Sequence, residues 1–282
     1  MQTVTDAARL RAVIRTWRGE GRSVGLVPTM GNLHEGHFAL LKLARSRCER
    51  VVASVFVNPT QFGPDEDFER YPRTLERDQA GLADHQCDLL FAPSMEAMYP
   101  FGPEHSVRVH VPRITDALEG AHRDGHFDGV ATVVSKLLHL VQPDVAVFGQ
   151  KDYQQLRVIE RLVRDLALPV RVVGAPTRRE ADGLAMSSRN QYLSDAERRL
   201  APQLYVTLRK MRELHLQGHA REAIEKAGAA RLARAGFDAD YIVIRRAEDL
   251  AEPGADERDG LMALAAARLG RTRLIDNLQF DQ

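Results

Sequence analysis

Two histidines three residues apart, His34 and His37, are the side chains whose types and spacing point most directly to chemistry. On the first turn of a helix, residues at this spacing share a face. A helix that begins here directs unpaired backbone N–H groups and a partial positive charge at the turn before it, which suits phosphate. The pattern predicts a site for a nucleotide whose phosphates gain charge during the reaction.

Two other interpretations are open on this motif alone: a metal site, or a pair of solvated histidines. A zinc hydrolase needs a third ligand, and its motif places two histidines four residues apart around a glutamate. The spacing of His34 and His37 does not match that motif, which disfavours zinc. The apolar segment before the pair, and the glycines at positions 31 and 36, favour phosphate.

A strand, a tight turn and a helix are predicted to position the pair. Residues 24–27 are apolar, Gly31 and Asn32 tolerate the backbone angles of a tight turn, and an apolar pattern at helical spacing starts at Phe38. A second apolar run, residues 51–57, is typical of a parallel strand buried on both faces. Together these elements predict a right-handed β–α–β unit.

The same design recurs at a later buried strand, residues 145–148, which leads into Gly149 and Lys151. A lysine at the carboxyl end of a strand can neutralise a phosphate as a point charge. A surface lysine is the alternative. Gln155 lies four residues after Lys151, on the same face of the helix that follows.

Two further polar residues, Gln61 and Asp78, follow the first β–α–β unit. Gln61 lies in a loop rich in proline and glycine, and loops beyond the carboxyl ends of parallel strands reach ligands. A plain turn residue is the alternative. Asp78 lies in a helix predicted to begin after Thr74, where it could serve Mg²⁺ through water; a solvated helix face is the other interpretation.

The alternation of strands and helices predicts an α/β fold, with a Rossmann-like parallel sheet flanked by helices over residues 1–176. Within this domain, the alternating pattern of residues 107–111 predicts an exposed strand. Residues 177–282 predict a smaller C-terminal α+β domain, because helices are followed there by strands. Its first long helix is expected to run from a capping box at Ser194 to about Gln217.

The polar segment at residues 177–190 joins these domains and carries Ser187, Ser188 and Arg189. Hydroxyls and a guanidinium suit the charged oxygens of a triphosphate, so the linker is expected to contribute to a nucleotide site. A plain linker is the alternative, although a ligand site between two domains is a common arrangement.

Composition narrows the class of protein. The 282 residues include 39 Lys+Arg and 39 Asp+Glu, so no net charge attracts nucleic acid. The only cysteines are Cys48 and Cys87, which suits a reducing compartment. We find neither a signal peptide nor an apolar run of roughly 18 residues. We therefore expect a cytoplasmic protein with small-molecule substrates, without nucleic acid and without membrane association.

Five long blocks give the chain a resemblance to the pantoate–β-alanine ligase family over essentially its whole length. These blocks are residues 28–37, 56–62, 125–130, 148–155 and 179–190. The family belongs to the nucleotidyltransferases with a His-x-Gly-His signature, whose middle is filled here by Glu35 and Gly36. Residues 186–189, Met-Ser-Ser-Arg, are similar to the second signature of the related class I aminoacyl-tRNA synthetases.

The resemblance implies that the protein forms pantothenate in two steps. ATP and (R)-pantoate form pantoyl adenylate and pyrophosphate, and the amine of β-alanine then displaces AMP. The resemblance also implies the use of Mg²⁺ and a cytoplasmic homodimer.

By the same resemblance, His37 is the assigned acid, and Gln61 and Gln155 hold pantoate, with Gln61 also near β-alanine. The residues that would contact ATP are Met30, Gly31, Asn32, Leu33, His34, Glu35, Gly36, His37, Gly149, Gln150, Lys151, Asp152, Arg178, Met186, Ser187, Ser188 and Arg189.

This chemistry agrees with the residue types. The pantoate carboxylate is ionised at neutral pH, so the first step needs positioning and charge neutralisation, not a general base. The groups suited to that catalytic task are His34, His37, Lys151 and Arg189, together with Mg²⁺. In the second step the amine must attack as the free base while water is excluded. The loops around Gly63 and at residues 120–129 are the expected lids.

The chain departs from the family pattern at Gln150, where glutamate is usual, and at Asp124, where proline is common. If position 150 contributes backbone atoms, little changes; a role of its side chain in binding metal or ribose would differ here. A nucleotidyltransferase that makes a CDP- or AMP-linked product is an alternative, which the blocks around Gln61 and Gln155 disfavour.

Two more distant alternatives are a small class I synthetase and a catalytically inactive nucleotide-binding module. The chain has no basic face for tRNA, which argues against the synthetase. The joint presence of His34, His37, Lys151 and Arg189 argues against the inactive module, because binding alone does not require all four.

Overall fold

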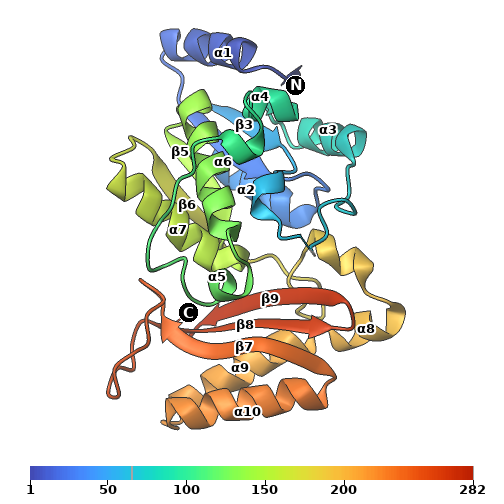
Figure 1. Ribbon diagram of the computed structural model, residues 1–282, viewed down its shortest axis with the longest axis vertical. Helices are drawn as coiled ribbons and strands as arrows, with labels where there is room; N and C mark the ends of the chain where they lie inside the picture. The colour runs from blue at the N-terminus through green and yellow to red at the C-terminus, as the bar shows by residue number, and fades with distance from the viewer. Residues whose placement is uncertain (65, 282) are drawn as a thin grey trace. The chain divides into compact units, whose positions relative to one another are not determined.

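The computed structural model describes residues 1–64 and 66–281 (Figure 1). The chain forms two compact units, of which the first contains Met1–Gln150 and Val158–Pro176 and the second contains Lys151–Arg157 and Thr177–Gln282. The short segment Lys151–Arg157 thus groups with the C-terminal unit, whereas the sequence placed it in the N-terminal domain.

The first unit is built on a six-stranded sheet in which all the paired strands are parallel. Its spatial order is β1-β4-β3-β2-β5-β6. The strands are β1 (Gln2–Val4), β2 (Val24–Thr29), β3 (Arg50–Val55), β4 (Leu89–Phe91), β5 (Val145–Gly149) and β6 (Arg171–Ala175). The strand order reverses between β2 and β5, and open α/β sheets bind ligands at the carboxyl ends of strands at such a point.

Helices cover this sheet and bury both of its faces. The helices are α1 (Ala7–Gly19), α2 (Glu35–Arg45), α3 (Leu75–Asp84), α4 (Met95–Met98), α5 (Glu119–His122), α6 (His126–Val141) and α7 (Tyr153–Asp165), whose first turn groups with the second unit. Leu41 and Ala44 of α2 pack against Val27 and Ala53 on one face, and α6 crosses in front of the sheet in Figure 1. Leu26, which precedes Val27 on β2 and points to the other face, is also fully buried, as a strand covered on both faces requires.

One predicted strand of the first unit is wrong. Residues 107–111 form no strand, and the N–H of Val109 donates instead to Oγ1 of Thr132 on α6, at 2.9 Å. Among the described residues, no helix is both long enough and apolar enough to cross a membrane.

The second unit contains a three-stranded antiparallel sheet in the order β7-β8-β9. Its strands are β7 (Phe237–Arg246), β8 (Leu261–Leu269) and β9 (Thr272–Gln279), and its helices are α8 (Asp195–Leu200), α9 (Gln203–Leu216) and α10 (Arg221–Arg234). The predicted capping box is present, because Ser194 and Glu197 cap α8 reciprocally. The single helix expected after it is interrupted at Pro202, which cannot donate a backbone hydrogen bond.

Candidate active site

The two histidines of the signature cap helix α2. Nδ1 of His34, the N-cap residue, accepts the N–H of Gly36 at 3.1 Å. Nδ1 of His37 accepts the N–H of His34 at 3.3 Å, and the two ring centroids are 4.2 Å apart. In a neutral imidazole whose Nδ1 accepts, the proton is on Nε2. Each ring can therefore donate a hydrogen bond from Nε2 at the positive end of the helix.

The turn before these histidines is held by a buried carboxylate, Asp78 on α3, which is 1% exposed. Its Oδ2 accepts the N–H of Asn32 at 2.9 Å, and its Oδ1 accepts the N–H of Leu33 at 2.8 Å. The hydroxyl of Thr74 also lies 3.1 Å from Oδ2. Gly31 has a φ of +85°, which suits a residue without a side chain.

These contacts give Asp78 a positioning task, because both carboxylate oxygens already accept hydrogen bonds from the protein. The role of Asp78 as a magnesium ligand stays a prediction, and these hydrogen bonds to its carboxylate do not favour it. The sequence missed the positioning task because Asp78 and the turn are 46 residues apart in the chain.

We predict that Asp78→Ala destabilises the protein by about 3 kcal/mol, because two buried N–H groups lose their acceptor. Any reaction in which His34 and His37 take part should slow as well, by on the order of 10-fold, since the turn would no longer be held in place. Urea unfolding measures the first effect, and the pyrophosphate release that the family resemblance implies measures the second. Glu76→Ala, which removes an exposed carboxylate on the same helix, is the matched control, and equal stabilities for both variants would contradict the assignment.

Gln61 ends a short 3-10 helix, Pro59–Gln61, beyond β3, and is only 8% exposed. Nδ2 of Asn58 donates to its side-chain Oε1 at 3.0 Å. Nε2 of Gln61 lies 3.2 Å from Sδ of Met30, in the turn after β2. The structure thus brings together two of the predicted site residues, from loops that follow neighbouring strands.

A buried histidine, His126, lies behind Gln61 at the start of α6 and was not assigned a role from the sequence. Its Nδ1 is 2.7 Å from the backbone oxygen of Gln61, and its Nε2 is 2.9 Å from Nη1 of Arg123. Burial, together with the guanidinium of Arg123, lowers the pKa of His126 to about 4. The imidazole is therefore neutral at physiological pH.

The lowered pKa of His126 makes stability depend on pH. Between its ordinary pKa and about 4 the unfolded chain binds the proton and the folded chain does not, so stability falls as the pH falls. From pH 8 to pH 5 this residue should cost about 2 kcal/mol of unfolding free energy. The free energy of unfolding, measured by urea titration at both pH values, should therefore fall by about 2 kcal/mol less in His126→Asn than in the parent.

The control for this prediction is His110→Asn. Asp128 raises the pKa of the exposed His110, so removing that imidazole changes the pH dependence in the opposite direction. The prediction would be contradicted if His126→Asn lost as much stability between pH 8 and pH 5 as the parent protein does.

In the second unit, Lys151 lies in the 3-10 turn Gln150–Asp152. Its ammonium is 3.6 Å from Oδ1 of Asp152, and its backbone oxygen accepts a hydrogen bond from Nδ2 of Asn277 on β9, at 2.9 Å. Gln155 follows on the first turn of α7 and is half-buried. Asn277 therefore fixes the backbone that carries the lysine.

The linker residues of the second unit form a small hairpin. The N–H of Met186 donates to the backbone oxygen of Arg178 at 2.9 Å, and Oγ of Ser187 accepts the N–H of Arg189 at 3.2 Å. Behind them, the guanidinium of Arg179 donates to both oxygens of Asp276, at 2.6 and 2.9 Å. Sequence reasoning missed Asp276 and Asn277, although an Asp-Asn pair inside an apolar strand was a visible signal.

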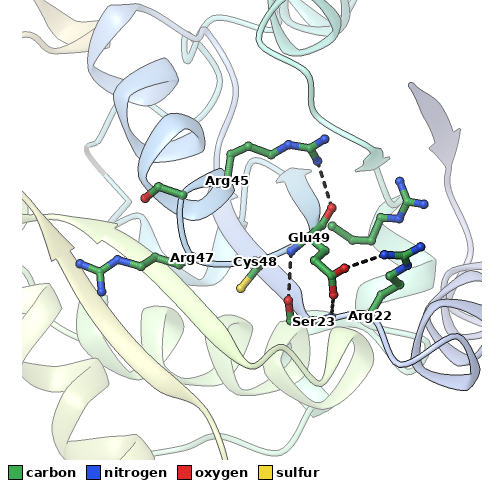
Figure 2. Close-up of a pocket in the computed structure, with 8 residues that line it drawn as sticks. Arg22, Ser23, Arg45, Arg47, Cys48 and Glu49 are labelled. Carbon is green, nitrogen blue, oxygen red and sulfur yellow. Dashed lines mark hydrogen bonds and ion pairs between the residues drawn. The ribbon is translucent and has the colours of Figure 1, made fainter.

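A separate hollow of about 550 Å³ lies at the opposite, amino-terminal ends of β2 and β3 (Figure 2). Arg22 pairs with Glu49 at 2.6 Å, and Arg50 pairs with Asp88 at 3.0 Å. Three of its four lining arginines, Arg22, Arg45 and Arg50, are engaged in ion pairs. Because the hollow also lies at the amino-terminal ends of the strands, opposite the ends where open α/β sheets bind ligands, we do not include it in the candidate site.

Comparisons with known proteins agree with the resemblance described above. A family model described as pantoate-beta-alanine ligase matches residues 2–279. The pantothenate synthetase of Xanthomonas axonopodis pv. citri (strain 306) is 54% identical over 280 residues, covering 99% of this chain and 100% of that protein. The pantothenate synthetase of Xylella fastidiosa (strain 9a5c) is 56% identical over 282 residues, with coverage of 99% and 100%.

Two solved structures are similar over the whole chain. A pantothenate synthetase from Thermus thermophilus has a TM-score of 0.93 and 52% identity, and 99% of each chain is covered. A pantoate–β-alanine ligase from Francisella tularensis, complexed with beta-gamma ATP and β-alanine, has a TM-score of 0.84 and 32% identity. That comparison covers 100% of this chain and 98% of the other.

Proposed function

The chain belongs to the pantoate–β-alanine ligase family, and we propose that it forms pantothenate in two steps through pantoyl adenylate. The overall reaction is the ATP-dependent condensation of pantoate with β-alanine. The observation that carries the mechanism is the capped start of α2, where both imidazoles accept through Nδ1 and can donate from Nε2.

In the first step the pantoate carboxylate attacks the α-phosphorus of ATP. A carboxyl oxygen–phosphorus bond forms, the α–β phosphoanhydride breaks, and pyrophosphate leaves with the bonding electrons. No base is needed, because the carboxylate is already ionised. Negative charge grows on the transferred and leaving phosphates, and we assign its stabilisation to His34, His37, Lys151 and Arg189.

The remaining ATP contacts are proposed on the family pattern. They come from residues 30–37, from residues 149–152, and from Arg178 and residues 186–188. Gln150 takes part through its backbone in this proposal, so the usual glutamate is not required there. The Francisella ligase complexed with beta-gamma ATP and β-alanine supports both molecules as ligands.

Pantoate is held by Gln61 and Gln155 in this proposal. Neutral amides can orient a hydroxyl and a carboxylate without adding charge beside the nucleophile. The buried position of Gln61 beside Met30 supports this assignment, because a fixed amide fixes the direction of its donors.

In the second step the free amine of β-alanine attacks the acyl carbon of the adenylate. A carbon–nitrogen bond forms, the bond from the acyl carbon to the phosphate oxygen breaks, and AMP leaves; the amine loses a proton to solvent. Gln61 lies near β-alanine in this proposal as well. Exclusion of water protects the adenylate from hydrolysis until the amine arrives.

Mg²⁺ is proposed as the companion of ATP. No three His, Cys, Asp or Glu side chains gather to hold a metal ion in the part of the chain that the structure describes. Mg²⁺ does not require such a cluster, because it usually keeps several waters and binds through one or two carboxylates and substrate phosphates. When bound, it neutralises phosphate charge.

We further propose a cytoplasmic homodimer, as the family resemblance implies. Cys48 and Cys87 are both buried and form no disulfide, which supports a reducing compartment.

Pyrophosphate release from ATP and Mg²⁺, with pantoate and with or without β-alanine, tests this function when the products are identified by mass. We expect pantoate-dependent release, with pantothenate only when β-alanine is present. Pyrophosphate release that depends on a different acid would show that pantoate is not the substrate. ATP binding without pyrophosphate release would favour the catalytically inactive nucleotide-binding module.

A further inference from the structure

The backbone oxygen of Gln61 accepts hydrogen bonds from two side chains that the mechanism does not use. Nδ1 of His126 lies 2.7 Å from this oxygen, and Nη2 of Arg123 lies 3.4 Å from it. A guanidinium can only donate, so the 2.9 Å contact from Arg123 makes Nε2 of His126 the acceptor. The proton of the neutral imidazole is therefore on Nδ1, directed at Gln61.

A salt bridge fixes the guanidinium that sets this tautomer. Nε and Nη2 of Arg123 contact the two carboxylate oxygens of Glu66 at 2.6 and 2.7 Å. The Arg123 side chain is only 13% exposed, and Glu119 lies 3.8 Å from its Nη1. Glu66 follows Gln61 in one expected lid loop, and Arg123 belongs to the other, so this pair joins the two loops.

The side-chain amide of Gln61 is held by contacts as well. Nδ2 of Asn58 donates to Oε1 of Gln61 and also to the backbone oxygen of Gly129 on α6, at 3.0 and 3.2 Å. A side chain at position 129 would collide with the backbone oxygen of Thr60. The first turn of α6 therefore packs directly on the backbone of the 3-10 turn that presents Gln61.

We propose that Arg123 and His126 are positioning residues that hold Gln61 in the orientation that binds pantoate. His126 transmits the position of Arg123 to the Gln61 carbonyl, and the Glu66 pair keeps Arg123 in place. A displaced Gln61 carbonyl turns the amide away from Asn58 and Met30, and the cost appears in pantoate binding rather than in ATP binding. The inference rests on the proposed role of Gln61.

Two amide substitutions at His126, each of which reproduces one ring nitrogen, separate this role from simple packing. His126→Asn keeps a donor at the position of Nδ1, whereas His126→Gln keeps an acceptor at the position of Nε2 and loses the donor to Gln61. We expect His126→Gln to raise the KM for pantoate on the order of 10-fold with the KM for ATP unchanged. His126→Asn should restore most of the loss.

Arg123→Lys provides a second test that does not alter the imidazole. It keeps the charge but loses the two-pronged contact with Glu66, and should raise the KM for pantoate on the order of several-fold. Circular dichroism melting confirms that each variant is folded. His105→Gln, at an imidazole that is 75% exposed, is the control for the substitution itself.

The steady-state KM values for pantoate and ATP, measured on the full chain, decide the question. Equal rises in both KM values, or equal losses in His126→Asn and His126→Gln, would overturn the proposal. Gln61→Ala distinguishes the two levels of inference. If Gln61→Ala raises the pantoate KM but His126→Gln and Arg123→Lys do not, positioning is overturned and the role of Gln61 stands. If Gln61→Ala leaves that KM unchanged, the assignment of Gln61 itself fails.

Discussion

His37→Ala is expected to lower the rate of adenylate formation by on the order of 10²-fold or more. The imidazole lies at the start of α2, and its Nε2–H can donate to a phosphate oxygen as charge develops there. Because the transition state carries more charge than bound ATP, the loss should appear in the rate and only weakly in ATP affinity. Pyrophosphate release with saturating ATP and pantoate measures it.

The same histidine also caps the helix, so its two roles must be separated. Nδ1 of His37 accepts the N–H of His34 at 3.3 Å, and alanine removes that acceptor as well. His37→Asn retains an acceptor near the position of Nδ1 but offers no donor at Nε2, whereas His37→Gln offers a donor near Nε2. We expect the asparagine variant to be as slow as alanine but more stable, and the glutamine variant to recover part of the rate.

An asparagine variant that turned over at the parental rate would remove His37 from the chemistry and leave it only a capping role. An alanine variant that lost activity solely because it unfolded would be recognised by its urea midpoint. The kinetic comparison is therefore made without denaturant, at a temperature at which all three variants are folded.

The central elements were predictable because local sequence is enough to specify them. The apolar runs that became β2, β3 and β5 are buried on both faces of a parallel sheet, and such runs have few other stable arrangements. The turn of Gly31 and Asn32 needs positive φ values, +85° and +51°, and both residue types tolerate them.

Elements that depend on distant partners were missed or wrong. Strand β1 has three residues, too few for a periodic pattern, and exists because Gln2–Val4 pair with β4. Residues 107–111 alternate like a strand, but their Val109 amide is satisfied by Thr132 of α6. An alternating pattern does not show what lies beside the backbone, and Val107, on the apolar side of this one, is 83% exposed.

The contacts that orient the predicted site residues were not predictable for the same reason. Asp78 reaches the turn at Asn32 across 46 residues of sequence, and Asn277 reaches Lys151 across 126. A sequence motif identifies the side chains that can take part in the chemistry. The side chains that position these residues belong to other elements, and they come close to the motif only in the folded chain.

Lys151→Ala is the second substitution expected to have a large effect, again on the order of 10²-fold or more in adenylate formation. Its ammonium is a compact charge, and its backbone is held by Asn277, so alanine removes the charge without freeing the turn. Stability should therefore change little, in contrast with Asp78→Ala. Pyrophosphate release and urea unfolding, measured on the same preparations, test both parts.

Two companion variants make the result specific to charge at this position. Lys42→Ala removes an exposed lysine on α2 and should leave the rate unchanged. Lys151→Arg keeps the positive charge but replaces the compact ammonium with a planar guanidinium, so we expect it to recover part of the rate. A Lys151→Ala variant within about threefold of the parent, a cost under about 1 kcal/mol in transition-state stabilisation, would show that the charge is supplied elsewhere. In that case the phosphate charge would be neutralised by Arg189, the histidines and Mg²⁺ alone.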